Sequence, residues 1–67
     1  DIAIVNEQPY AFDKDIVVAM VDEEATIKYF YKDKDAVRLQ PANPAYRPIL
    51  RKDIKIIGKV IKIIRNY

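Results

Sequence analysis

The stretch that most constrains the fold is Ile16–Phe30, where two apolar runs flank three acidic residues. Residues 16–21 are all apolar, and residues 25–31 are rich in β-branched and aromatic side chains. Two such runs on either side of a short polar segment are typical of a β-hairpin. We therefore predict a strand over residues 16–21, a turn at Asp22-Glu23-Glu24 and a strand over residues 25–31.

One charged residue, Lys28, interrupts the second run between Ile27 and Tyr29. It is either a solvated residue on the outer face of the strand or a buried amine. Ile27, Tyr29 and Phe30, with the strand at residues 16–21 opposite, are expected to supply apolar surroundings. A lysine with the ordinary pKa of about 10.4 stays protonated at neutral pH, whereas burial in an apolar site lowers that pKa by several units. Since most lysines are solvated, the residues alone leave both readings open.

The composition of the 67 residues restricts the class of protein to one small domain. Without Cys or His, the chain has no disulfide and no ordinary zinc site, and the lack of Cys fits a cytoplasmic protein. It has no apolar run of membrane-spanning length. We interpret Asp22, Glu23 and Glu24 as a solvated turn, because adjacent acidic residues at a hairpin tip point in different directions and make a poor metal site.

The rest of the chain predicts further short strands and one long loop. Residues 2–5 and 37–39 have the composition of strands, and the alternating charges of residues 32–35 indicate a hairpin turn. Residues 40–48 contain three of the four prolines, which exclude a helix or a central strand. We expect an extended surface loop there, with a turn starting at Asn43-Pro44.

The last apolar segment, residues 54–64, fits two kinds of element. The lysines at positions 52, 55, 59 and 62 follow the spacing of a helix face, which would suit a membrane surface or a partner groove. Most of the apolar residues are β-branched, however, and Gly58 interrupts the segment, so we favour a strand with a bulge or bend at Gly58.

An unpaired apolar strand of this kind is prone to aggregate. Pairing with a second copy of the chain is the simplest way to bury it. We therefore predict a homodimer whose interface lies near residues 59–66. The residues expected at this interface are Lys59, Val60, Ile61, Lys62, Ile63, Ile64 and Arg65.

The basic charge of the chain is confined to this tail. Residues 1–50 carry six Lys or Arg and nine Asp or Glu, and residues 51–67 carry six Lys or Arg and one Asp. A small β-barrel that stacks single-stranded nucleic acid on its tyrosines is therefore an alternative function. The tyrosines are not spaced with the lysines, so core and edge positions also explain them. A structural interaction module without catalytic ancestry is a third reading. The five tyrosines are Tyr10, Tyr29, Tyr31, Tyr46 and Tyr67.

Three segments in series resemble the catalytic domain of LexA repressors. Residues 15–30 resemble the stretch that carries the catalytic lysine, and residues 38–44 resemble the loop that follows it in LexA of Gram-positive and thermophilic bacteria. Residues 56–61 and Arg65 resemble the closing strand. The match covers nearly the whole chain, in order and with similar spacings. Phage repressors and UmuD-type polymerase subunits are close relatives of the same family.

The resemblance implies an all-β fold of the LexA and signal-peptidase type, with several short curled antiparallel sheets. The family consists of bacterial, cytoplasmic repressors of the SOS response that bind operator DNA through an N-terminal domain. They dimerise and cleave their own chain when RecA filaments stimulate them. The nucleophile is a serine and the base is an unprotonated lysine, which Lys28 matches by position.

This chain departs from the family in having no serine at all. The resemblance therefore implies that residues 1–67 form the C-terminal part of one peptidase and dimerisation domain. The DNA-binding domain and the serine-bearing segment are absent. We expect the chain alone to be inactive, without a cofactor or a metal.

Overall fold

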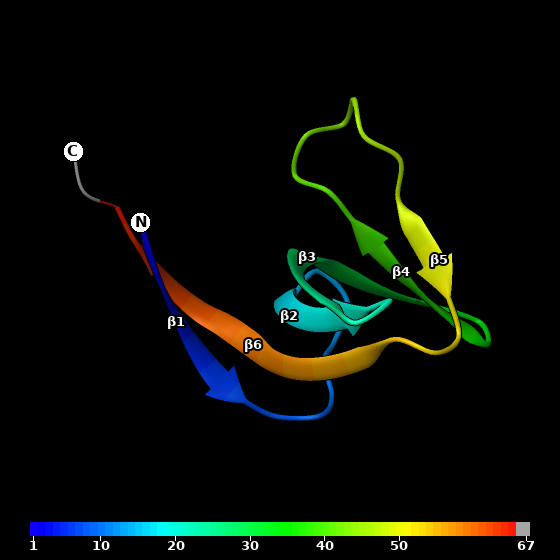
Figure 1. Ribbon diagram of the computed structural model, residues 1–67, viewed down its shortest axis with the longest axis horizontal. Helices are drawn as coiled ribbons and strands as arrows, with labels where there is room; N and C mark the ends of the chain where they lie inside the picture. The colour runs from blue at the N-terminus through cyan, green and yellow to red at the C-terminus, as the bar shows by residue number, and fades with distance from the viewer. Residues whose placement is uncertain (66–67) are drawn as a thin grey trace.

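A computed structural model describes residues 1–65 of the chain, in which all regular structure is β-strand. The strands lie in a single antiparallel sheet in the order β1-β6-β2-β3-β4-β5 (Figure 1). The predicted all-β class is confirmed, and its strands form one curled sheet where we expected several. Their bounds are β1 Ile2–Glu7, β2 Ile16–Val21, β3 Glu24–Asp33, β4 Ala36–Gln40, β5 Ile49–Arg51 and β6 Lys55–Ile64.

The central hairpin of β2 and β3 confirms the first prediction from the sequence. Its register pairs Val21 with Glu24, so the turn contains only Asp22 and Glu23. Both turn residues have positive φ, 51° and 67°. Positive φ at both central positions is the geometry of a type I′ turn, whose twist matches that of the paired strands. The hairpin is thus tight, and β3 is longer than predicted at both ends.

The second half of the sheet contains one strand that the sequence did not reveal. β4 returns beside β3 as predicted, and the proline-rich segment after it forms a loop without regular structure. The backbone N–H of Tyr46 donates to the Asn43 carbonyl at 3.1 Å, which confirms the turn at Asn43-Pro44. β5 follows this loop and pairs with β4 at the edge of the sheet. Its three residues are too few to give a periodic pattern.

The last apolar segment is a strand and not a helix. β6 lies between β1 and β2 and pairs with both. The register with β2 passes from Gly58 to Ile56 across one step of β2, so Ile57 is the extra residue of a bulge beside Gly58. A second register shift, opposite Ile4 and Val5, makes Ile61 the extra residue there. Both bulges increase the twist of β6.

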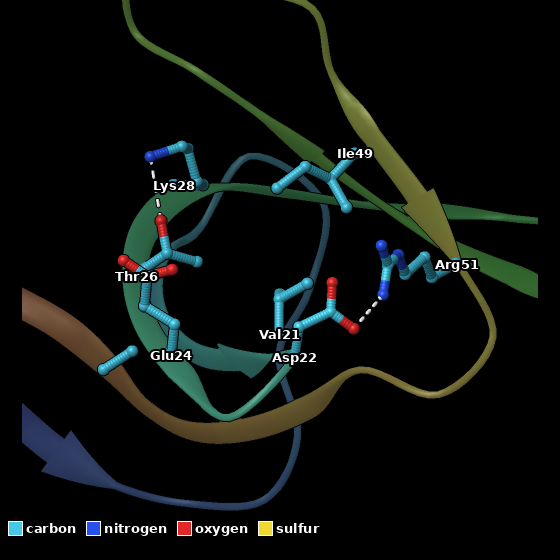
Figure 2. A pocket seen from close by; sticks show the side chains of 8 residues that line it. Val21, Asp22, Glu24, Thr26, Lys28, Ile49 and Arg51 are labelled. Atoms are coloured by element: carbon cyan, nitrogen blue, oxygen red, sulfur yellow. Dashed lines mark hydrogen bonds and ion pairs between the residues drawn. The ribbon is translucent and has the colours of Figure 1, made fainter.

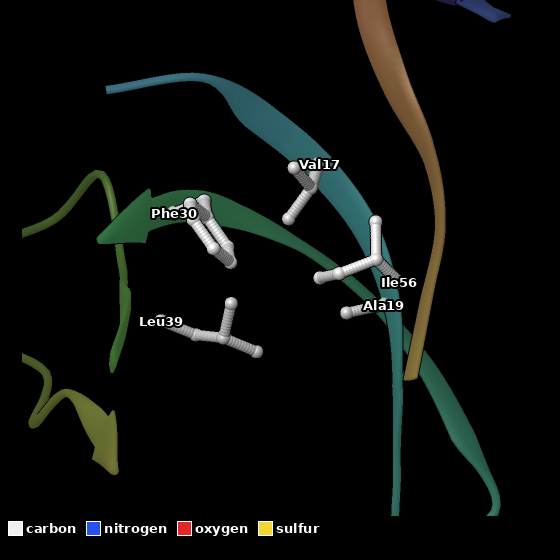
Figure 3. Packing of buried hydrophobic residues seen from close by; sticks show 5 residues of the cluster. All are labelled: Val17, Ala19, Phe30, Leu39 and Ile56. Atoms are coloured by element: carbon white, nitrogen blue, oxygen red, sulfur yellow. The ribbon is translucent and has the colours of Figure 1, made fainter. Parts of the chain in front are cut away.

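The sheet curls around a small apolar core on its concave face. Val17 and Ala19 from β2 meet side chains from the neighbouring strands β3 and β6 and from β4 (Figure 3). Because all of them alternate onto one face, four strands share a single core. The buried cluster consists of Val17, Ala19, Phe30, Leu39 and Ile56.

β1 and the end of β6 run side by side away from this core, toward the two chain ends (Figure 1). We call this two-stranded projection, residues 2–5 and 60–64, the terminal arm. Apart from Val60, which is buried, its apolar side chains are largely exposed. Asn66, at the end of the predicted dimer interface, and Tyr67 lie outside the described residues. Residues 1–65 contain no helix that is long and apolar enough to cross a membrane.

Candidate active site

Strand alternation places Lys28 on the concave, core-bearing face of the sheet. Lys28 is directly opposite Val17, which is fully buried, and two residues from Phe30, which is almost fully buried. Side chains two apart in a strand, and side chains directly opposite across a ladder, lie on the same face. Lys28 is therefore half-buried at the border of the core and is not a residue of the outer face.

The expected apolar surroundings of Lys28 are only partly correct. Ile27 is 50% exposed and Tyr29 is 36% exposed, because alternation turns both to the opposite face of β3. The apolar neighbours on the face of Lys28 are Phe30 and, from the opposite strand, Val17, both of which belong to the predicted surroundings. Linear sequence neighbours misled the prediction, since in a strand the nearest residues along the chain point away from each other.

The Lys28 amine is held by oxygens that carry no formal charge. Its Nζ donates to the hydroxyl of Thr26 at 2.9 Å (Figure 2). It also donates to the Ile27 carbonyl at 3.3 Å. Within residues 1–65, no carboxylate forms an ion pair with this amine. Thr26 was not among the predicted site residues. The sequence could have indicated Thr26, because residues two apart in a strand lie on the same face and Thr26 stands two residues before Lys28.

A cleft of about 330 Å³ opens beside the Lys28 amine. One wall comes from the β2–β3 hairpin and the other from β5, so residues far apart in the sequence meet there (Figure 2). The cleft combines apolar and polar side chains, which is typical of ligand-binding sites. Its lining residues are Val21, Asp22, Glu24, Ala25, Thr26, Lys28, Ile49 and Arg51.

An ion pair between Asp22 and Arg51 connects the two walls of this cleft (Figure 2). The hydrogen bond and the charge of Asp22 raise the pKa of the Arg51 guanidinium above its usual value. No local pattern predicts this pair, because 28 residues separate its members and β5 was not predicted. Among residues 1–65, no cluster of acidic side chains is arranged to hold a metal ion.

A smaller cleft of about 180 Å³ adjoins Lys28 from the side of the C-terminal strand. Ile63 and Arg65 line it together with Lys28 and Tyr29. The structure thus brings part of the predicted dimer segment beside the predicted base.

The other members of the predicted dimer segment differ in how accessible they are. Val60 is buried in the sheet of its own chain, and Lys59 forms an ion pair with Asp15 at 3.3 Å. The exposed members are the five residues that follow, Ile61, Lys62, Ile63, Ile64 and Arg65.

The tyrosines considered for nucleic-acid binding do not share one surface. Tyr10 and Tyr46 lie on two separate loops, whereas Tyr29 and Tyr31 lie on β3. The Arg38 guanidinium lies 4.5 Å from the centre of the Tyr31 ring, in a cation–π contact between β4 and β3. Tyr67 lies outside the described residues.

Comparisons with known proteins agree with the resemblance stated above. The chain is 57% identical over 98% of its length to the LexA repressor of Caldicellulosiruptor saccharolyticus. It is 52% identical over 98% of its length to the LexA repressors of Citrifermentans bemidjiense and of Acetivibrio thermocellus. The chain spans about a third of the length of these curated relatives. The family model described as Peptidase S24-like matches residues 1–61, and the chain therefore belongs to this peptidase family.

Proposed function

We propose that this chain is the lysine-bearing, C-terminal part of a LexA-type repressor that inactivates itself by cleaving its own backbone. The observation that carries this proposal is the placement of Lys28. Its amine lies on the core face of the sheet, opens onto a cleft and is bonded to a neutral hydroxyl. The relatives named as LexA repressors support the assignment to a repressor rather than to another peptidase.

In the proposed reaction, Lys28 acts as the base of a Ser-Lys pair. A serine from a part of the parent protein outside these residues enters the cleft, and the Lys28 amine accepts its hydroxyl proton. The serine oxygen bonds to the carbonyl carbon of the scissile peptide. As the carbon–nitrogen bond breaks, the proton passes from Lys28 to the leaving amine. Water then hydrolyses the resulting ester.

Thr26 holds the amine in place for this reaction. A neutral hydroxyl satisfies the lysine without stabilising its charged form as a carboxylate would, which suits a group that must act as a base. Val17 and Phe30 on the same face exclude water from the stem of the side chain. Thr26 is thus a positioning residue in this proposal.

The cellular role follows from the same family assignment and is part of the proposal. The parent protein binds operator DNA through an N-terminal domain that is absent here, represses genes of the SOS response, and cleaves itself when a RecA filament stimulates it in the bacterial cytoplasm. A UmuD-like or phage-repressor relative is the alternative within the family. The chain of residues 1–67, lacking serine, is expected to be inactive alone.

The parent is also proposed to dimerise through the exposed apolar side of the terminal arm. Isoleucines at positions 2, 4, 61, 63 and 64 are exposed there in a single copy of the chain. A second copy related by twofold symmetry would bury these side chains and cover the strand edges of the arm.

The decisive experiment replaces Lys28 in the full-length parent and measures self-cleavage. Lys28→Arg keeps the positive charge and most of the stem, but a guanidinium does not lose its proton in proteins. Lys28→Arg and Lys28→Ala are both expected to slow cleavage by at least about a thousandfold. Lys34→Ala, at an exposed lysine that lines neither cleft beside Lys28, is the matched control and should cleave normally.

As a test of folding, operator binding and the mass of the dimer are measured for each variant. Both should equal those of the unmodified parent, because neither depends on the Lys28 amine. Cleavage by Lys28→Ala at alkaline pH, at a rate near that of the parent, would remove Lys28 from the mechanism.

A further inference from the structure

We propose that a groove on the far side of the core from Lys28 binds an extended acidic peptide of a partner protein. The groove runs between the loop at residues 8–12 and the beginning of β6. It consists of a cleft of about 340 Å³ and a more open one of about 540 Å³, which share Pro9, Lys55 and Ile56. None of its lining residues belongs to either cleft beside Lys28.

The floor of the groove is apolar and has room for a side chain. Phe30, Val37 and Ile54 line the 340 Å³ cleft below the loop, at the border of the core cluster. An aliphatic or aromatic side chain that fills this space removes its own surface and that of the floor from water. The partner is therefore expected to contribute one large apolar residue.

An exposed aromatic residue, Tyr10, lines the groove, and the ring of Phe12 packs against it from outside the lining. Tyr10 is 57% exposed and Phe12 is 69% exposed, with ring centres 6.0 Å apart in an edge-to-face arrangement. The Gln8 side-chain amide donates to the Tyr10 carbonyl at 2.9 Å, and the Phe12 N–H donates to the Asp15 carboxylate at 2.9 Å. Because the backbone is already fixed, a partner that contacts these rings loses little additional entropy of ordering.

The positive charge of the groove is confined to its 340 Å³ cleft, since Glu7 lines the more open cleft, and an acidic partner is expected to place its carboxylates over the 340 Å³ cleft. Among the described residues that line the 340 Å³ cleft, the only charged ones are Lys32 and Lys55. Neither lysine forms an ion pair within residues 1–65. A peptide with carboxylates on both sides of its apolar residue would place one near each ammonium group.

The end of β1 leaves a strand edge open in the same place. Pairing of β1 with β6 stops at Glu7 and Gly58, followed by one hydrogen bond from Gln8 N–H to the Ile57 carbonyl at 3.2 Å. The chain then turns away at Pro9, so β1 does not cover the edge of β6 at Lys55. An extended peptide can continue the line of β1 there and bond to the backbone of β6.

A peptide fits these features better than single-stranded nucleic acid does. The planes of the Tyr10 and Phe12 rings are 72° apart, so the two rings cannot stack two successive parallel bases. The apolar floor also offers nothing to a phosphate or a sugar.

The test is a titration of the chain, labelled with ¹⁵N, with the probe peptide Glu-Leu-Asp-Phe-Glu, followed by NMR. Chemical-shift changes are expected at residues 9–12, 32 and 54–56. Fluorescence anisotropy with a labelled form of the peptide then measures affinity. A version with lysine at the three acidic positions should not bind, because it meets the same charge in the groove.

Variants of the groove provide the second arm of the test. Lys32→Glu with Lys55→Glu is expected to weaken binding by at least about tenfold, since two favourable charge contacts become repulsive. Lys34→Glu with Lys52→Glu changes the net charge equally outside the groove and should leave the affinity nearly unchanged. Tyr10→Ser with Phe12→Ser removes exposed rings without touching the core and should also weaken binding.

Three results would overturn the proposal. One is tighter binding of labelled oligothymidylate than of the acidic peptide. Another is a set of shift changes that maps outside the groove. The third is an equal loss of affinity in both double charge variants, which would show attraction to the overall charge only. None of these results depends on whether Lys28 is a base.

Discussion

At the scale of single residues, the contact between Thr26 and Lys28 predicts a graded effect on self-cleavage. Thr26→Val keeps the shape of the side chain but removes the hydroxyl that accepts the Lys28 hydrogen bond at 2.9 Å. A misplaced base typically costs up to about a hundredfold in rate, so we expect slower cleavage with an altered pH–rate profile. Thr26→Ser should cleave nearly as the parent does. The same rate and pH profile in Thr26→Val as in the parent would show that Thr26 does not position Lys28.

Gly58 gives the second prediction at this scale, because β1 crosses β6 too closely for any other residue. A Cβ atom at position 58 would lie 2.5 Å from Val5 Cγ1 and 2.6 Å from the Asn6 carbonyl oxygen. Gly58→Ala is therefore expected to lower the free energy of unfolding by about 1–3 kcal/mol in a urea titration, as overpacking of a tight contact does. Hydrogen exchange should accelerate mainly in β1.

A second substitution separates the two contacts of that Cβ. Val5→Ala removes the side-chain contact but leaves the Asn6 backbone in place, so it should restore only part of the stability. Full stability of Gly58→Ala alone would mean that β1 does not approach β6 as closely as described.

At the scale of elements, the β2–β3 turn carries a conformation that its residues disfavour. Asp22 and Glu23 both have positive φ without being glycine, and each such residue costs about 1 kcal/mol. Glu23→Gly removes this cost at one position and is expected to raise the free energy of unfolding by about 0.5–1 kcal/mol. Asp35→Gly, in the turn between β3 and β4, is the control, because Asp35 does not have positive φ. This control should be slightly destabilised. A loss of stability in Glu23→Gly would contradict the turn geometry.

At the scale of the whole molecule, the terminal arm predicts the oligomeric state. Light scattering at micromolar concentration should give the mass of two copies, because a dimer buries the exposed isoleucines of the arm. Ile61→Lys with Ile63→Lys should reduce the mass to that of one copy, since burying two lysines at an apolar interface is unfavourable. Leu50→Lys, at an exposed residue of β5 at the other edge of the sheet, should remain dimeric. The mass of one copy for the unmodified chain would exclude the proposed interface.

Local composition was enough to determine the strands that have a strong pattern of their own. The apolar run at residues 16–21, the acidic turn and the β-branched tail predicted β2, β3 and β6, since backbone preference and side-chain alternation act over a few residues. The prolines likewise determined the loop after β4. Lys28 was identified because a single charge within an apolar strand is conspicuous.

The tertiary structure alone decided what those residues meet. The sequence did not show which face of β3 Lys28 occupies, because that choice depends on the register with β2. Nor did it show that β5 would lie over the hairpin and bring Arg51 to Asp22. Both depend on which distant strands pair in the curled sheet and in which register. A pattern of neighbouring residues does not specify these pairings.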